Sequence, residues 1–152
     1  MEQAINDLEN MTLAEVTGKL QLPDQDFDGW LGELGLLHRR QTCNTCGNEM
    51  AKSTTRPKWV CHRRECRNGS TKPSKSYYSG TFFEKSKIRT KSIFYLSYYW
   101  CHQYGTIANQ EYETGISSHS IVQWHQYFRD VCAEYFVRNP QKIGGPGRVN
   151  IT

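Results

Sequence analysis

Two cysteine pairs, Cys43-Asn44-Thr45-Cys46-Gly47 and Cys61-His62-Arg63-Arg64-Glu65-Cys66, decide how the middle of this chain folds. Each pair places two thiolates on one turn, and Gly47 permits the positive φ that lets backbone amides point at sulfur. A hairpin that brings the two turns together makes a tetrahedral cage of four sulfurs, which suits Zn²⁺. We therefore expect one zinc ion per chain, with ligands Cys43, Cys46, Cys61 and Cys66.

The residues between the pairs predict the hairpin that this site needs. Met50–Lys52 and Lys58–Val60 are expected as strands, and residues 54–57 as the turn. A cage of four sulfurs leaves no position open for water, so the zinc is expected to be structural. Two alternatives stay open: the cysteines are unrelated buried or redox-active thiols, or His62 replaces one of them as a ligand.

The composition indicates a protein with small cores and no membrane span. Hydrophobic residues make up 37% of the chain and the mean hydropathy is −0.73, so a metal ion is a reasonable additional source of stability. No run of apolar residues is long enough to cross a membrane. The acidic N-terminus does not resemble a signal peptide. We expect an intracellular protein, located in the nucleus if the source is eukaryotic.

Charge is divided unevenly along the chain. Residues 1–34 carry eight acidic residues and one basic residue, for −7, and the other 118 residues carry 18 basic and seven acidic residues, for +11. Such a basic body predicts a polyanion partner, usually nucleic acid, and the partner expected from the whole sequence is double-stranded DNA; a basic surface that only aids solubility is the alternative. Nine basic residues concentrate in one stretch: Arg63, Arg64, Arg67, Lys72, Lys75, Lys85, Lys87, Arg89 and Lys91.

Helical periodicity is predicted on both sides of the cysteine region. In the acidic segment 1–35, one weak helix is expected over 1–22, interrupted by Pro23 and residues 24–26, and a short helix over Phe27–Leu34. From Thr90 three further helices are expected: one closed near Gly105, one over Ile107–Thr114, and one from Ser117 or Ser118 to about Arg138. The expected buried residues of the last three helices, with the two remaining cysteines, are Ile93, Leu96, Trp100, Tyr104, Ile121, Trp124, Phe128, Val131, Tyr135, Cys101 and Cys132. Phe82 and Phe83 are expected to pack between the cysteine region and these helices.

The last two helices have the start and stop signals of a helix-turn-helix. The shorter one ends at Gly115, Ile116 supplies an apolar plug, and a serine caps the helix that follows. In that motif the start of the last helix enters the major groove. The side chains expected to reach phosphates or base edges are Ser117, Ser118, His119, Ser120 and Gln123. A helical bundle that does not bind DNA is the alternative.

Several stretches, in this order and spacing, resemble the N-terminal half of a Merlin-type DDE transposase, a family with bacterial insertion-sequence relatives. They are Trp59-Val60-Cys61 with Cys66, Ser79-Gly80-Thr81-Phe82-Phe83-Glu84-Lys85-Ser86-Lys87, Glu113-Thr114-Gly115-Ile116-Ser117 with Trp124 and Arg129-Asp130-Val131-Cys132, and Ile143-Gly144-Gly145-Pro146-Gly147. The resemblance covers roughly residues 27–150. The polar helix over residues 108–112 departs from the family, whose helices carry small residues there.

This resemblance implies binding to the terminal inverted repeats of a transposable element, with the zinc ribbon in support. In that family an RNase-H-like domain then cuts and joins DNA with three acidic residues and two metal ions. The first of those acids follows the glycine–proline motif, and here the sequence ends at Thr152 before it. The resemblance therefore implies that the chain has no catalytic residues and is not an enzyme.

Together these observations predict an α+β fold made of four parts. The parts are an acidic helical segment (1–35), a zinc ribbon (38–82), a three-helix helix-turn-helix unit (86–138), and a Gly/Pro tail (139–152) that leads toward an absent catalytic domain. The expected function is DNA binding without cleavage and without a small-molecule substrate. The alternative is a transposase-derived adaptor that holds a protein partner, such as a second copy of the chain or a full-length transposase.

Overall fold

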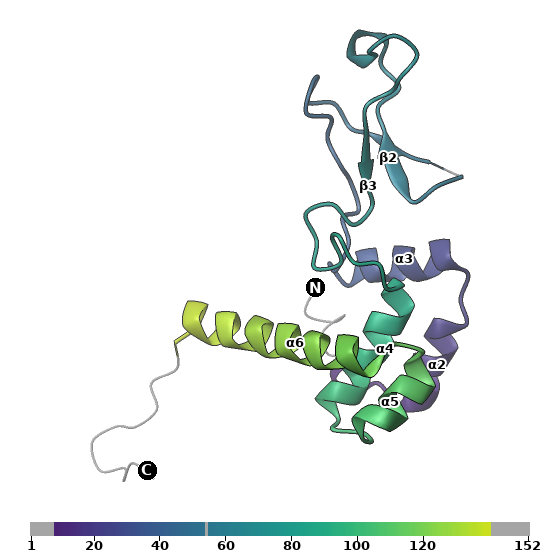
Figure 1. The fold of residues 1–152 in the computed structure, drawn as a ribbon. Coiled ribbons are helices and arrows are strands. Elements are labelled where there is room, and N and C mark those ends of the chain that lie inside the picture. The colour runs from purple at the N-terminus through teal and green to yellow at the C-terminus, as the bar shows by residue number, and fades with distance from the viewer. Residues whose placement is uncertain (1–7, 54, 141–152) are drawn as a thin grey trace. The chain divides into compact units, whose positions relative to one another are not determined.

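The computed structural model describes residues 8–53 and 55–140, which form an α+β fold of five α-helices and one three-stranded antiparallel sheet (Figure 1). The described residues divide into two compact units, with the boundary between Lys91 and Ser92. The first unit contains α2 (Leu13–Leu20), α3 (Asp24–Glu33), β1 (Ala51–Lys52), β2 (Lys58–Val60) and β3 (Ser74–Ser76). The second contains α5 (Ile107–Thr114), α6 (Ser118–Arg138) and most of α4 (Thr90–Cys101).

The N-terminal segment contains a helix boundary that the apolar pattern does not reveal. The predicted single helix over 1–22 is wrong in its described part, because the chain leaves helical geometry before Thr12 and starts α2 at Leu13. Thr12 and Glu15 form a capping box, in which each side chain satisfies a backbone amide of the other residue. Residues 1–7 lie outside the described residues, as does the predicted tail beyond Pro140.

The acidic residues after Pro23 are predicted to interrupt the helices. This is wrong, because they belong to α3. Pro23 is the N-cap, and Asp24 and Asp26 lie in the first turn, where carboxylates stabilise the positive end of the helix dipole. Phe27 and Leu31 of α3 are fully buried, as is Val16 of α2. These three side chains belong to the buried hydrophobic residues of the first unit.

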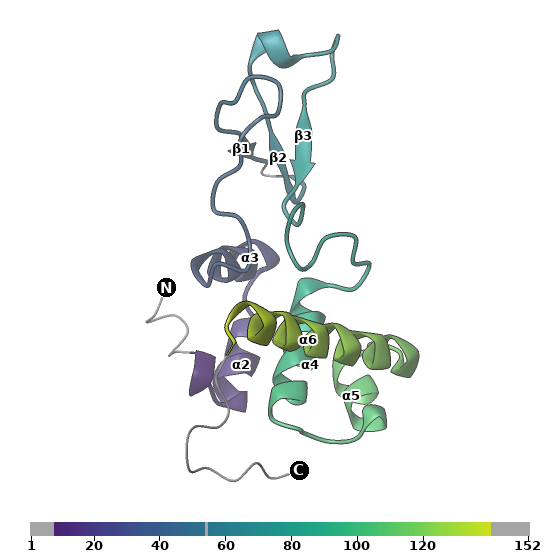
Figure 2. The same ribbon diagram turned by 90° about the vertical axis from the view of Figure 1, so that its left-hand side faces the viewer.

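The sheet has the order β1-β2-β3, and both strand pairs are antiparallel (Figure 2). The β1–β2 hairpin is the predicted one, with Ala51 opposite Val60. The third strand was not predicted, because Ser74-Lys75-Ser76 contains no apolar residue. It pairs through its backbone, with Lys75 opposite Trp59.

The helices of the second unit begin and end at local signals. The predicted limits of α5 and α6 are confirmed: Thr106 and Ser117 cap their N-termini, and Gly115 ends α5 with a φ of 68°. Helix α4 ends earlier than predicted, at Cys101, because Gln103 takes a positive φ of 54°. The buried apolar side chains of this unit are Ile93, Leu96, Ile116, Ile121, Trp124 and Phe128.

Several predicted core positions are wrong, and those on α6 share one cause. The second half of α6 extends beyond the residues that α4 packs against, where Trp100 meets Phe128 with ring centroids 5.5 Å apart. Val131 and Tyr135 are therefore exposed. The other exposed positions are Cys101, Cys132, Phe82 and Tyr104. Phe83, in contrast, is buried as predicted.

Candidate metal centre and basic surface

The four predicted ligands lie together in the first unit. The sulfurs of Cys43, Cys46, Cys61 and Cys66 are all within 4.8 Å of one another. The Sγ atoms of Cys43 and Cys66 are 4.0 Å apart, and those of Cys46 and Cys61 are 3.9 Å apart. A tetrahedral ion with metal–sulfur bonds of about 2.3 Å requires sulfur–sulfur edges of about 3.8 Å. The cage therefore has the right size for a tetrahedral metal ion.

The first cysteine pair is held by a tight turn. Gly47 adopts a φ of 68°, and its amide donates to the carbonyl of Cys43 over 2.8 Å. The amide of Cys43 donates in turn to the carbonyl of Asn48 over 2.9 Å. The glycine was predicted to permit this geometry, since a side chain at that φ is strained.

The second cysteine pair is positioned by two different elements. Cys61 follows directly after β2, and its amide donates to the carbonyl of Pro73 over 2.9 Å. Cys66 is the last residue of a 3₁₀ helix, η1 (Arg64–Cys66). This turn of helix takes up the longer spacing of the second pair. His62 lies outside the cluster, where its Nδ1 is 3.4 Å from Nζ of Lys72.

The cysteine cage and the aromatic core of the sheet are one packed cluster. Cys43, Cys61, Cys66, Met50 and Trp59 are all buried and in contact, and Tyr77 packs against them. The rings of Trp59 and Tyr77 are 5.4 Å apart. A change in the cage is therefore transmitted directly to the core of the sheet.

Hydrogen bonds favour the thiolate form on the first turn. Backbone amides of Cys46 and Thr45 hold the pKa of the Cys43 thiol at about 6, well below its ordinary value. The side chain and the backbone amide of Asn48 lower the pKa of the Cys46 thiol in the same way. The first turn is therefore the part of the cage where the thiols ionise more readily.

The second turn favours protonated thiols while no ion is bound. The pKa of the Cys66 thiol is raised to about 12. The largest cause is its interaction with the Cys46 thiol, and the second is burial. For Cys61 the amide of Arg63 lowers the pKa, but burial and the neighbouring thiols outweigh it and the net shift is upward. A divalent cation deprotonates such thiols when it binds, so binding here releases protons.

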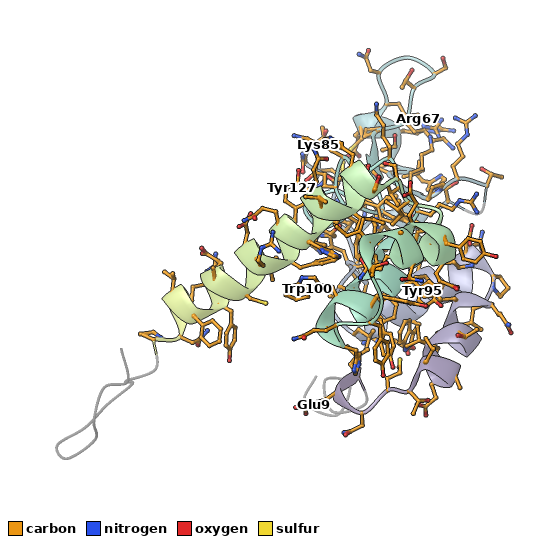
Figure 3. All side chains as sticks on the ribbon, turned by 60° about the horizontal axis from the view of Figure 1, so that its bottom comes forward. Glu9, Arg67, Lys85, Tyr95, Trp100 and Tyr127 are labelled. Carbon is orange, nitrogen blue, oxygen red and sulfur yellow. The ribbon has the colours of Figure 1, made fainter. Side chains whose placement is uncertain are left out.

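Most of the predicted basic residues are exposed. The seven exposed ones are Arg63, Arg64, Arg67, Lys72, Lys85, Lys87 and Arg89, and Figure 3 labels Arg67 and Lys85. The other two are half-buried and engaged by the protein itself. Lys75 donates to the carbonyl of Thr42 over 2.7 Å. Lys91 pairs with the carboxylate of Asp24 over 2.7 Å and donates to the carbonyl of Leu22 over 2.6 Å.

The predicted contact residues on α6 lie around its first turn. Ser117 caps the helix by accepting a hydrogen bond from the amide of Ser120. Ser118 is exposed, and its amide donates to the carboxylate of Glu111 over 3.1 Å. His119 and Gln123 are exposed one turn apart, with their side-chain nitrogens 3.2 Å apart. Four of the five side chains are exposed, and Ser120 is half-buried.

A polar contact that the sequence does not signal lies around Asp28. Its carboxylate accepts hydrogen bonds from the hydroxyls of Tyr78, over 3.3 Å, and Thr90, over 3.5 Å. Burial raises the pKa of Asp28, although these hydroxyls lower it. Together with the Asp24–Lys91 pair, this contact joins the acidic helix α3 to the segment that follows the sheet.

None of the described helices has both the length and the apolar composition needed to cross a membrane. Comparison of this chain with protein-family models, curated proteins and solved structures gives no match. The function must therefore be argued from the residues themselves.

Proposed function

We propose that this chain binds double-stranded DNA, with a structural Zn²⁺ ion in the four-cysteine cage and α5 and α6 acting as a helix-turn-helix. The observation that carries the proposal is the exposed polar start of α6, which follows a buried plug and a left-handed glycine. Each of these features has a physical role in such a motif. The metal and the basic residues add independent support.

The turn between α5 and α6 is rigid in the way that a recognition helix requires. Gly115 reverses the chain in a left-handed conformation, and Ile116 is buried. The amide of Ile116 donates to the hydroxyl of Thr114 over 3.2 Å, and that hydroxyl donates to the carbonyl of Gln110 over 2.7 Å. The plug and these hydrogen bonds hold the start of α6 at a defined angle to α5.

The side chains at the start of α6 suit the edges of base pairs. Gln123 can donate and accept at adenine, and His119 can contact guanine or a phosphate. Ser118 is short enough to let the helix approach a groove closely. Tyr112, on α5, is strongly exposed and was not predicted, and its hydroxyl suits a phosphate oxygen.

The first unit supplies positive charge beside the metal centre. Arg63 and Arg67 flank η1, and Arg64 begins it. Zinc is the ion proposed because four thiolates at tetrahedral spacing match its preference. The ion holds these arginines on a defined loop, and their attraction to phosphates is not specific for sequence.

The resemblance to Merlin-type transposases gives the proposed target, which is the terminal inverted repeat of a transposable element. We propose binding without cleavage. In the described residues, the all-cysteine cage is the only cluster of three or more metal-ligating side chains. A cage closed by four protein ligands leaves no position for the water or DNA oxygen that metal-assisted cleavage uses.

Salt-dependent binding tests this proposal. Fluorescence anisotropy with a labelled DNA duplex should show log K falling with log salt at about −0.9 per phosphate contacted, so at most about −6 if all seven exposed basic residues contribute. Replacing Arg63 and Arg64 by alanine should reduce the slope by about 2. The matched control, Arg129→Ala with Arg138→Ala on the far half of α6, should leave the slope unchanged.

A transposase-derived protein adaptor is the second candidate. It is favoured by the Asp24–Lys91 pair, in which the acidic α3 occupies one of the predicted DNA-binding lysines. An adaptor predicts no DNA binding at about 50 mM salt, or a flat salt slope. Either result would replace the DNA-binding proposal with this one.

A further inference from the structure

The three helices of the second unit border one hollow with a volume of about 420 Å³. Helix α4, the loop that follows it, α5 and α6 all contribute to its lining, and Figure 3 labels Trp100, one of the residues from α4. The lining includes Tyr99, Trp100, Gln103, Gly105, Gln110 and His125. Pockets for small molecules have volumes of about 300–1,000 Å³, so the hollow is large enough for a small ligand.

Two residues in this lining each have a buried polar atom without a hydrogen-bond partner. These atoms are Oε1 of Gln110 and Nε2 of His125. Among the described residues, only one other buried side-chain nitrogen or oxygen, in Trp59, has no partner. Each such atom lowers stability, because it has lost its hydrogen bonds to water and gained none in return. Two of the three belong to residues that line one hollow, which points to a ligand that satisfies both.

The amide of Gln110 is held so that its oxygen is the group without a partner. Its Nε2 donates to the carbonyl of Tyr104 over 3.1 Å, and a carbonyl can only accept, so the orientation of the amide is fixed. Tyr104 lies between two left-handed residues of the loop after α4, Gln103 with a φ of 54° and Gly105 with a φ of 68°. A positive φ is uncommon for a residue with a side chain, and strained positions concentrate at ligand sites. Both the acceptor and the loop are therefore features of a binding site.

The chemistry of the hollow favours a neutral, planar ligand. None of its lining residues is an acid, a lysine or an arginine, so an ionic ligand would find no opposite charge there. Burial lowers the pKa of His125, which keeps its ring neutral at neutral pH. Trp100 and Tyr99 offer aromatic rings for stacking. A ring that carries an N–H donor for Gln110 and a nitrogen acceptor for His125 meets all of these conditions.

We propose that this hollow binds a neutral nitrogen heterocycle of the nucleobase class, whose N–H donates to Oε1 of Gln110 and whose ring nitrogen accepts from Nε2 of His125. Because both atoms are buried, the ligand displaces side chains of the lining to reach them. The site lies in the second unit, whereas the metal cage lies in the first. This inference goes beyond DNA binding and does not depend on it.

Nuclear magnetic resonance of the full, metal-loaded chain tests this site with adenine and cytosine as probes. Both should bind with a Kd of about 1 mM or below, as ligands of about ten non-hydrogen atoms allow. The shifted resonances should include the side chains of Gln110, His125 and Trp100. Benzene, which is planar but forms no hydrogen bonds, should bind at least about tenfold more weakly.

His125→Phe keeps an aromatic ring and removes the nitrogen that has no partner. It should raise the Kd for adenine at least roughly tenfold without lowering the stability of the free chain. The matched control is His119→Phe, at an exposed position of the same helix outside the lining, and it should leave the Kd within about twofold. Circular dichroism and bound metal confirm that each variant is folded.

Three binding results would overturn the proposal. They are the absence of any shift in the lining residues with either probe at about 5 mM, binding of benzene as tight as that of adenine, and binding of adenine by H125F no weaker than by H119F. A crystal structure of the free chain that pairs Oε1 of Gln110 with Nε2 of His125 would also overturn it, because neither atom would then lack a partner.

Discussion

Replacing Cys43 by serine should cost this chain most of its affinity for zinc. Structural zinc in small domains contributes about 10–16 kcal/mol, so one of four ligands accounts for about 2.5–4 kcal/mol. The Kd for zinc should therefore rise about 10²- to 10³-fold. The cage supports an effect of this size because two of its sulfur–sulfur distances, 4.0 and 3.9 Å, already lie near those of a tetrahedral site.

Two measurements read out this change. Native mass spectrometry should give one zinc per wild-type chain, and competition with a chromophoric chelator gives the Kd. Near-ultraviolet circular dichroism should report looser packing of Trp59, which is buried in the same cluster as the cage. Cys101→Ser is the matched control, because that thiol is exposed and outside the cage.

Two results would refute this reasoning. The first is a C43S chain that binds zinc as tightly as the wild type, which would mean that Cys43 is not a ligand. The second is an equal loss of zinc in C101S, which would mean that the substitutions act through general instability. If a chelator removes the metal and the Trp59 signal does not change, the packing of the sheet core does not depend on the ion.

Three further predictions concern stability and are checked by denaturant or thermal unfolding of the metal-loaded chain. Trp59→Ala should lower the free energy of unfolding by about 3–5 kcal/mol, because it removes a buried aromatic ring. Gly115→Ala should lower the free energy of unfolding by about 1–2 kcal/mol, because the φ of Gly115 is 68°. Gly29→Ala, at a helical position of α3 with open space around it, should raise it by about 0.5–1 kcal/mol. Equal effects of the two substitutions would contradict the assigned conformations. Burial, and to a smaller extent the charge of Arg129, lowers the pKa of His125 in the folded chain. As the pH falls below 6.5, His125 is therefore protonated in the unfolded chain before it is protonated in the folded chain, and the free energy of unfolding decreases. His125→Gln should flatten this part of the pH profile, and an unchanged profile would exclude His125 as its source.

The features predictable from the sequence are those that depend on a few neighbouring residues. The limits of α5 and α6 follow from Thr106, Gly115 and Ser117, because each satisfies or terminates a helix end through its own side chain or φ. The cysteine pairs likewise predict their own turns. At Pro23 the local signal has two meanings: residues 24–26 are predicted to break the helix, but carboxylates also favour the first turn of a helix, and α3 begins at Asp24.

Other features depend on pairing between distant segments and leave no local trace. The strand β3 contains only polar residues and exists because the backbone of β2 has a free edge beside it. Asp28 meets Tyr78 and Thr90, which lie 50 and 62 residues away along the chain. Hydrogen bonds of this kind are determined by geometry, for which residue type is a weak guide.

By itself, the sequence determined which four cysteines cluster and where the last two helices end, because paired cysteine turns and helix capping act over a few residues. Only the tertiary structure decided which apolar side chains are buried. The apolar residues of α6 from Trp124 to Tyr135 recur at regular helical spacing, yet Phe128 is buried and Val131 is exposed. Burial requires a facing surface, and within the described unit α4 provides one only as far as Trp100 reaches Phe128.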